Sequence, residues 1–308
     1  MAKNSSHCSV CIRECKTGHS YCQRRDEKGY LKQEYRFNAI LVDRLFDKPV
    51  THFRENARVL SVGSWGCNFR CLGCQNVNLS WSVNGQNLGY RDIPPKELVN
   101  LALENDCKGI CYTYNEPAIL LETVERIADE AHENGIFNVF VTNSTLTGKS
   151  VKRISGKIDA VAADIKSMDD DFYYDYCGAE GIPRVAEKIL HCIKTFFNAG
   201  CHVEVRTNII PGINEKEETY RGIAAWIRDN LGYDTPWHIT RFFPANKLSH
   251  VGHTRAESML EAEQIGHDEG LRFVHVYLDK GCDCAKESSM VSQENTSWKS
   301  SDHCCCCN

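Results

Sequence analysis

Three cysteines stand close together in the segment GSWGCNFRCLGCQN, where Cys67, Cys71 and Cys74 follow the spacing C-x3-C-x2-C. The segment comes directly after a β-branched run that predicts a strand over residues 58–65. Three thiolates on one short loop can bind three irons of a cubane cluster and leave the fourth iron open for an exogenous ligand. A zinc loop that takes a distant fourth ligand is the alternative.

The 308-residue chain contains 18 cysteines, an unusually high number. Cys8, Cys11, Cys15 and Cys22 follow C-x2-C-x3-C-x6-C, which predicts a metal site, either a tetrahedral zinc or a second iron–sulfur cluster. The five cysteines in the middle of the chain are expected to be small buried residues: Cys107, Cys111, Cys177, Cys192 and Cys201. The pattern leaves open whether Cys282, Cys284 and the run at 304–307 bind metal, act on a substrate or form a redox tail.

Short apolar runs rich in β-branched and aromatic residues recur from about residue 55 onward. They predict strands over residues 58–65, 109–115, 137–143, 160–166, 202–210, 237–243 and 273–278. Their near-continuous apolarity is typical of a parallel sheet covered on both faces. Helices are predicted over residues 94–105, 117–134, 184–199, 215–230 and 257–269. Six or seven β-then-α units indicate an α/β fold, and because a closed barrel needs eight, we expect a partial barrel.

The composition excludes several classes of protein. The formal charge is 36 − 41 = −5, so there is no basic excess for binding nucleic acid. No apolar run reaches the roughly 18 residues of a membrane span, and no signal peptide is evident, so a cytoplasmic protein with reduced thiols is expected. We expect a cysteine-rich lobe over residues 1–50, the barrel over residues 51–280 and a flexible cysteine-containing tail over residues 281–308.

The triad segment resembles the TAGCNFRCPFCQN segment of the radical S-adenosylmethionine (SAM) superfamily, in its pyruvate-formate-lyase-activating-enzyme-like branch and the AmmeMemoRadiSam group in particular. Further similar segments follow in the same order, over roughly residues 8–285: KPVTHF, YTYNEP, VFVTN, DIK, VEVRTNIIPGIN and PWHITRFFP. The resemblance implies a partial (β/α)6 barrel with a [4Fe-4S] cluster on the loop after its first strand.

The resemblance also implies roles for polar residues near the ends of successive strands. Cys67, Cys71 and Cys74 would bind the cluster, and Asn115 and Glu116 would hold the amino group of SAM. The remaining expectations are cofactor binding by Thr142, Asn143, Asp164, Lys166 and His238, with catalytic roles for Lys166, Arg206 and His238. The structural alternatives are a helix-entry carboxylate for Glu116, an ion pair of Asp164 with Lys166, and a core histidine for His238.

Three positions depart from the wider superfamily. Gly73 stands before the third cysteine, where an aromatic residue near the adenine is usual. Val141 stands where activating enzymes often carry an Asp associated with a cation. Tyr114-Asn115-Glu116 replaces the usual Gly-Gly-Glu, a change that this branch shares.

The expected function is reductive cleavage of SAM to a 5′-deoxyadenosyl radical that abstracts hydrogen from a small-molecule or protein substrate. Flavodoxin or ferredoxin is the expected electron donor, with no nucleic-acid or membrane partner. The alternatives are activation of a glycyl-radical enzyme, aminocarboxypropyl transfer from SAM, a non-catalytic thiol-rich protein that handles metals or metalloids, and an electron-transfer protein.

Overall fold

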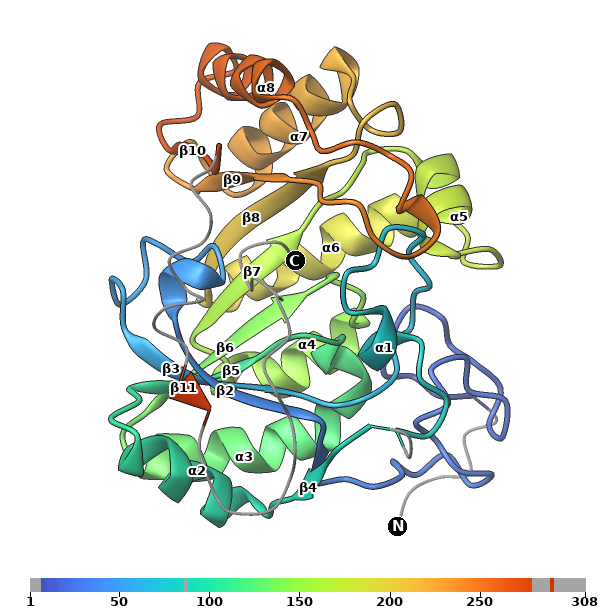
Figure 1. Ribbon diagram of the computed structural model, residues 1–308, viewed down its shortest axis with the longest axis vertical. Helices are drawn as coiled ribbons and strands as arrows, with labels where there is room; N and C mark the ends of the chain where they lie inside the picture. The colour runs from blue at the N-terminus through green and yellow to red at the C-terminus, as the bar shows by residue number, and fades with distance from the viewer. Residues whose placement is uncertain (1–6, 86–87, 279–288, 291–308) are drawn as a thin grey trace.

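The computed structural model describes residues 7–85, 88–278 and 289–290. In this part of the chain, one sheet has the strand order β10-β9-β8-β7-β6-β5-β3-β2-β11 (Figure 1). Its parallel strands are β3 (Arg58–Gly63), β5 (Gly109–Tyr112), β6 (Phe137–Thr142), β7 (Ala160–Asp164), β8 (His202–Ile209), β9 (Trp237–Arg241) and β10 (Val274–Val276). β2 (Ala39–Arg44) and β11 (Ser289–Met290) are antiparallel, and β1 (Arg36–Phe37) pairs with β4 (Arg91–Asp92) in a separate ladder.

The parallel sheet confirms the predicted α/β fold and all seven predicted strands. Each strand ends one to three residues before its predicted end. Every residue of β5 and β7 is buried, as expected for strands that are covered on both faces. No ladder in the described residues joins β10 to β2 or β11, so the sheet is an open, partial barrel.

Helices connect the parallel strands and cover the sheet. The predicted helices correspond to α2 (Pro95–Glu104), α3 (Leu121–Glu133), α6 (Val185–Asn198), α7 (Glu217–Asn230) and α8 (Ala256–Asp268). The predicted helix 117–134 begins as a 3-10 turn at Pro117–Leu120 and continues as α3. Shorter helices were not predicted from the sequence: α1 (Val77–Ser80), α4 (Gly148–Ile154) and α5 (Asp170–Cys177), with 3-10 turns at Leu45–Asp47, Ser155–Lys157 and Asn246–Leu248. Figure 1 shows α7 and α8 near β9 and β10, and α2 and α3 at the other end of the sheet.

The cysteine-rich N-terminal segment consists mostly of turns and packs against the loops at the carboxyl ends of the strands. The Ile12 amide donates to the Thr145 carbonyl at 2.9 Å, and Arg25 forms a salt bridge of 2.7 Å with Glu122 of α3. The predicted lobe of residues 1–50 includes β2, which pairs with β3 of the sheet.

Most of the predicted tail, residues 281–308, lies outside the described residues. The expectations for Cys282, Cys284 and the cysteines at 304–307 lie there too. None of the helices in the described part of the chain is long and apolar enough to cross a membrane.

Candidate active site

One pocket lies at the carboxyl ends of the parallel strands. It brings together most of the residues that the sequence singled out: Cys67, Cys71, Cys74, Asn115, Glu116, Thr142, Asn143, Asp164, Lys166 and Arg206. They come from the segments in or after β3, β5, β6, β7 and β8, so residues far apart in sequence meet because parallel strands end on the same side.

The triad loop is held in a defined shape by backbone hydrogen bonds. The Cys74 amide donates to the Cys71 carbonyl at 3.2 Å, while the amides of Arg70 and Leu72 donate to carbonyls at the end of α5 at 2.8 and 2.9 Å. Gly66 has a φ of 85°, and a Cβ there would lie 2.9 Å from the Cys22 carbonyl oxygen. The loop therefore needs glycine at this point, both for the turn and for contact with the N-terminal segment.

The triad thiols fit a cluster chemically. Burial raises the pKa of Cys74 to about 11 and contributes to a pKa of Cys67 well above its usual value. Thiols in this setting become thiolates when an iron cation compensates the charge. Within the described residues, no three Cys, His, Asp or Glu side chains are placed to enclose a single metal ion. A cubane binds each thiolate through a different iron, so its ligands need not converge on one point.

A fourth cysteine lies beside the triad. The fully buried Cys177, at the end of α5, forms a side-chain hydrogen bond with Cys71, and this bond is the main cause of the raised pKa of Cys71, followed by burial. The sequence suggested only a small buried residue here. Because Cys177 lies more than a hundred residues from the triad in the sequence, no local pattern indicated this contact.

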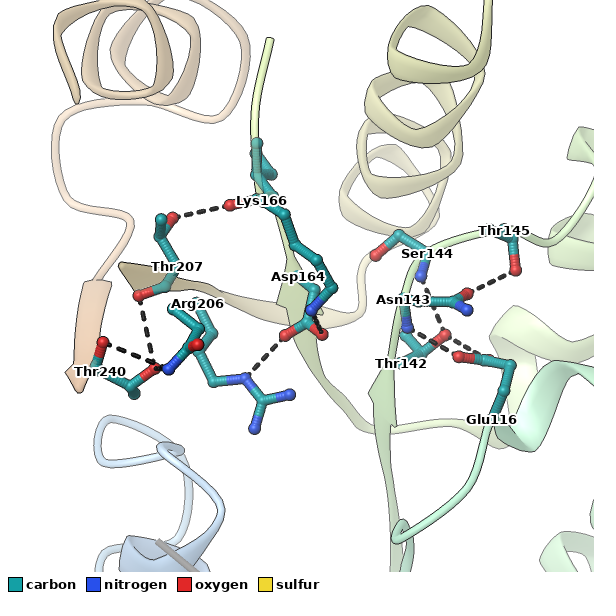
Figure 2. Close-up of polar contacts among 12 residues, drawn as sticks. Glu116, Thr142, Asn143, Ser144, Thr145, Asp164, Lys166, Arg206, Thr207 and Thr240 are labelled. Atoms are coloured by element: carbon teal, nitrogen blue, oxygen red, sulfur yellow. Dashed lines mark hydrogen bonds and ion pairs between the residues drawn. The ribbon is translucent and has the colours of Figure 1, made fainter. Parts of the chain in front are cut away.

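Glu116 ties together the ends of two neighbouring strands. Its Oε1 accepts from the Ala118 amide at 2.9 Å. Oε1 also accepts from the Thr142 hydroxyl at 2.6 Å, and Oε2 accepts from the Asn143 amide at 2.7 Å (Figure 2). Burial raises its pKa to about 7 despite these bonds. The helix-entry role is therefore present, because the carboxylate caps the turn at Pro117–Leu120, but the same carboxylate also lines the pocket.

The two asparagines brace the pocket wall. Asn115 accepts from the Ser64 amide at 2.8 Å and donates to the Gly66 carbonyl at 3.0 Å, which fixes the start of the triad loop. Asn143 donates to the side chain of Asn68 at 2.9 Å. Both amides thus connect the strand ends to the loop that carries the cysteines.

Asp164 is shared by two cations. Lys166 Nζ lies 2.7 Å from Asp164 Oδ2, and Arg206 Nε lies 2.6 Å from Asp164 Oδ1. Burial works to raise the pKa of Asp164, but Arg206 and Lys166 hold it below its usual value. Burial likewise opposes the charge of Lys166, yet the Asp164 carboxylate raises the pKa of this amine. One carboxylate thus contacts two cations in the wall of the pocket.

His238 does not line this pocket. It is the second residue of β9 and is fully buried, with Nε2 2.6 Å from Glu204 Oε2, Nδ1 2.9 Å from the Tyr277 hydroxyl, and its ring stacked on that of His275. Burial lowers its pKa. The expectation that it lies at the carboxyl end of a strand is wrong, because the ladder starts at Trp237, and the core-histidine alternative describes its surroundings.

Two aromatic side chains from elsewhere in the chain lie beside Gly73, the position before Cys74 where the wider superfamily usually carries an aromatic residue. A Cβ on Gly73 would lie 2.6 Å from the Phe242 ring and 2.9 Å from the Tyr176 hydroxyl. Both aromatic residues line the pocket, one after β9 and the other in α5. Gly73 therefore makes room for two rings that come from elsewhere in the chain.

Comparison with known proteins agrees with this geometry. The sequence pattern of the radical SAM superfamily matches residues 62–226, more than half of the chain. An uncharacterized protein of Methanocaldococcus jannaschii is 34% identical over 285 residues, which cover 89% of this chain and 81% of that protein. The benzylsuccinate synthase activating enzyme of Thauera aromatica is 25% identical over 148 residues, which cover 47% of this chain and 43% of that enzyme.

A solved structure shares the fold. The radical SAM methyltransferase from Sphaerobacter thermophilus has a TM-score of 0.54 and 16% identity, and the match covers 74% of this chain and 68% of that one. The matched residues 62–226 contain the triad, Glu116 and the Asp164–Lys166–Arg206 group. The chain is thus an enzyme whose family uses a [4Fe-4S] cluster and SAM, and it belongs to the radical SAM superfamily.

Proposed function

We propose that Cys67, Cys71 and Cys74 hold the cluster and that the pocket places SAM against it for radical generation and hydrogen abstraction. The observation that carries this proposal is the lining of one pocket by the three thiols, Glu116 and the Asp164–Lys166–Arg206 group. When bound, the cluster supplies the electron that cleaves the sulfonium of SAM and yields the 5′-deoxyadenosyl radical.

Opposite charges on the two sides of the pocket match the methionine end of SAM. An ionised carboxylate has about four acceptor sites, and Glu116 uses three of them within the protein, so one is available to the ammonium group. The two cations Lys166 and Arg206, which line the pocket, match the SAM carboxylate. These residues orient the cofactor, and the burial of the site strengthens both interactions.

Phe242 and Tyr176 are proposed to take the place of the usual aromatic residue beside the adenine. Both line the pocket next to Gly73, directly before the third cysteine. Stacking on an aromatic ring suits every nucleobase, because each presents a π-face.

The substrate is proposed to be a protein or a small molecule that gives up a hydrogen atom. A glycyl-radical enzyme is the leading protein substrate, since a relative of this chain is named as the activating enzyme of benzylsuccinate synthase. Flavodoxin or ferredoxin is the proposed electron donor, in the cytoplasm. The N-terminal cysteines are proposed to bind a second metal centre, either an iron–sulfur cluster or zinc.

The products of SAM test this proposal. The protein is reconstituted anaerobically with iron and sulfide, dithionite and SAM are added, and the nucleosides are separated. Formation of 5′-deoxyadenosine by the wild type and not by Cys71→Ala is the expected result. Methylthioadenosine would instead support aminocarboxypropyl transfer, and no cleavage despite an intact cluster would contradict radical catalysis and favour a metal-handling role.

A further inference from the structure

The four N-terminal cysteines lie together in a small cluster of turns. The Cys8 amide donates to the Cys15 carbonyl at 2.7 Å, and the Tyr21 amide lies 3.5 Å from Cys15 Sγ. The thiols are close enough to influence one another electrostatically, Cys11 with Cys8 and Cys22, and Cys22 with Cys8 and Cys15. The spacing seen in the sequence thus becomes one four-thiol group, which we call the lobe cysteines.

The lobe cysteines have an outer and an inner side. Cys8 and Cys15 are partly exposed, while Cys11 and Cys22 are buried. The Cys22 carbonyl packs against Gly66 of the triad loop, 2.9 Å from where a Cβ would be. The inner side of the group therefore faces the triad, and the outer side faces solvent.

A single side chain connects the two cysteine groups. Asn68 is buried and forms a side-chain hydrogen bond with Cys11. Its Oδ1 lies 3.9 Å from the sulfur of the neighbouring Cys67. Arg13, two residues after Cys11, donates from Nε to the Asn68 carbonyl at 2.5 Å and fixes this contact. Cys11 and Cys67 are thus linked through one amide.

A buried cation beside the lobe cysteines, Arg24, forms no ion pair within the described part of the chain. Arg24 is fully buried, stacks on the ring of Trp65 at 4.3 Å and donates from Nη2 to the Gln33 carbonyl at 3.3 Å. Its Nε and Nη1 have no hydrogen-bond partner among the residues that the structure describes. A buried guanidinium with unsatisfied donors is costly, and a metal centre with four thiolate ligands next to Cys22 would supply the missing negative charge.

We infer that the lobe cysteines bind an iron–sulfur cluster that passes electrons through the Cys11–Asn68–Cys67 contact to the triad cluster. Zinc has no redox chemistry and would make no use of this contact. The inference rests on the proposed function, because it explains how the radical reaction receives its electron.

The electron balance is simple. A low-potential flavin or iron–sulfur protein gives one electron to the oxidised lobe cluster from the side of Cys8 and Cys15 and is itself oxidised. The lobe cluster then gives that electron to the triad cluster and returns to its oxidised state. No bond in the lobe forms or breaks.

Reciprocal variants of the full-length protein test the metal centre. The triple variant Cys67→Ala, Cys71→Ala, Cys74→Ala should keep about four of about eight irons per chain and give an electron paramagnetic resonance signal on reduction. The double variant Cys8→Ser, Cys15→Ser should keep the irons of the triad cluster, about half of the total. Cys201→Ser is the matched control, because its hydroxyl can replace the thiol bonds to the carbonyls of Ser155 and Ile158, and it should keep all the iron. Zinc, or no metal, in the triple variant would overturn the inference.

Electron entry is tested by comparing two reductants. The double variant should form 5′-deoxyadenosine about tenfold more slowly than wild type with reduced flavodoxin, and within about twofold of wild type with dithionite, a small reductant that reaches the triad directly. Equal rates for both proteins with flavodoxin would overturn the relay. If the wild type makes no 5′-deoxyadenosine with dithionite while the triple variant still shows a reducible cluster, the proposed function fails and the lobe cluster stands.

Discussion

Two buried polar groups occupy successive levels inside the same sheet. At the carboxyl ends, Asp164 is shared by Lys166 and Arg206, and all three side chains line a pocket. Two residues nearer the start of β8, Glu204 accepts from the amides of Thr51 and His52 at 3.0 and 2.9 Å.

Glu204 also accepts from two histidines, His202 at 2.8 Å and His238 at 2.6 Å. Burial works to raise the pKa of Glu204, but these bonds hold it well below its usual value. Because Nε2 of His238 donates to Glu204, Nδ1 of the same ring accepts a hydrogen bond from the Tyr277 hydroxyl. Both carboxylate oxygens of Glu204 are bonded within the protein, which indicates a structural role. Charged side chains that line a pocket, as Asp164, Lys166 and Arg206 do, indicate a ligand site.

The largest expected effect on stability follows from Glu204→Ala. It leaves two backbone amides and two imidazoles without their acceptor inside the sheet, so the free energy of unfolding should fall by about 3–5 kcal/mol. Urea unfolding at pH 7 measures it. A loss of unfolding free energy below about 1 kcal/mol would contradict the structural role of the Glu204 group.

Lys166→Met should change function rather than stability. Asp164 keeps Arg206 as its partner, so the loss of unfolding free energy should be smaller than that of Glu204→Ala. SAM binding should weaken by about 2 kcal/mol, or roughly 30-fold, because the SAM carboxylate loses one cation. Equilibrium binding to the reconstituted protein measures this, and unchanged affinity would refute the assigned role.

The two groups should also differ in their response to pH. His238 has a lowered pKa in the folded protein, so the unfolded chain binds the proton first and stability falls as the pH drops below the ordinary histidine value near 6.5. Glu204, whose pKa is also lowered, loses its contribution as the pH falls further. Unfolding free energies at pH 7, 6 and 5 should decrease in that order, and a flat profile would contradict the network.

In the pocket, the titrating group is Glu116. Burial raises its pKa to about 7, so the ionised form that attracts the SAM ammonium is lost as the pH falls below 7. SAM affinity should drop by up to about tenfold per pH unit below that value, and Glu116→Gln should remove this dependence. A variant that keeps the wild-type profile would show that another group governs binding.

The smallest effect is expected from Cys177. A hydrogen bond to a cluster ligand stabilises the more negative, reduced state, so Cys177→Ala should lower the reduction potential of the triad cluster. Cys177→Ser, which keeps a donor, should give a smaller shift. Redox titration followed by electron paramagnetic resonance compares the two, and identical potentials in all three proteins would exclude this contribution.

The strands and the triad were predictable because both are local patterns. Near-continuous apolar runs predicted β5 and β7, and cysteine spacing predicted the loop after β3. The contact of Cys177 with Cys71 and the replacement of the ring at Gly73 by Phe242 were not predictable, since each depends on residues that only the fold brings together. The predicted position of His238 at the carboxyl end of its strand was wrong, because that position depends on where the ladder begins.

The most direct test compares Lys166→Met with His238→Gln, each reconstituted and normalised to its cluster content, for formation of 5′-deoxyadenosine at limiting SAM. If the pocket at the carboxyl ends is the active site and the Glu204 group is structural, Lys166→Met loses most of its rate and His238→Gln keeps a rate close to wild type. The reverse order would contradict the assignment of the two groups.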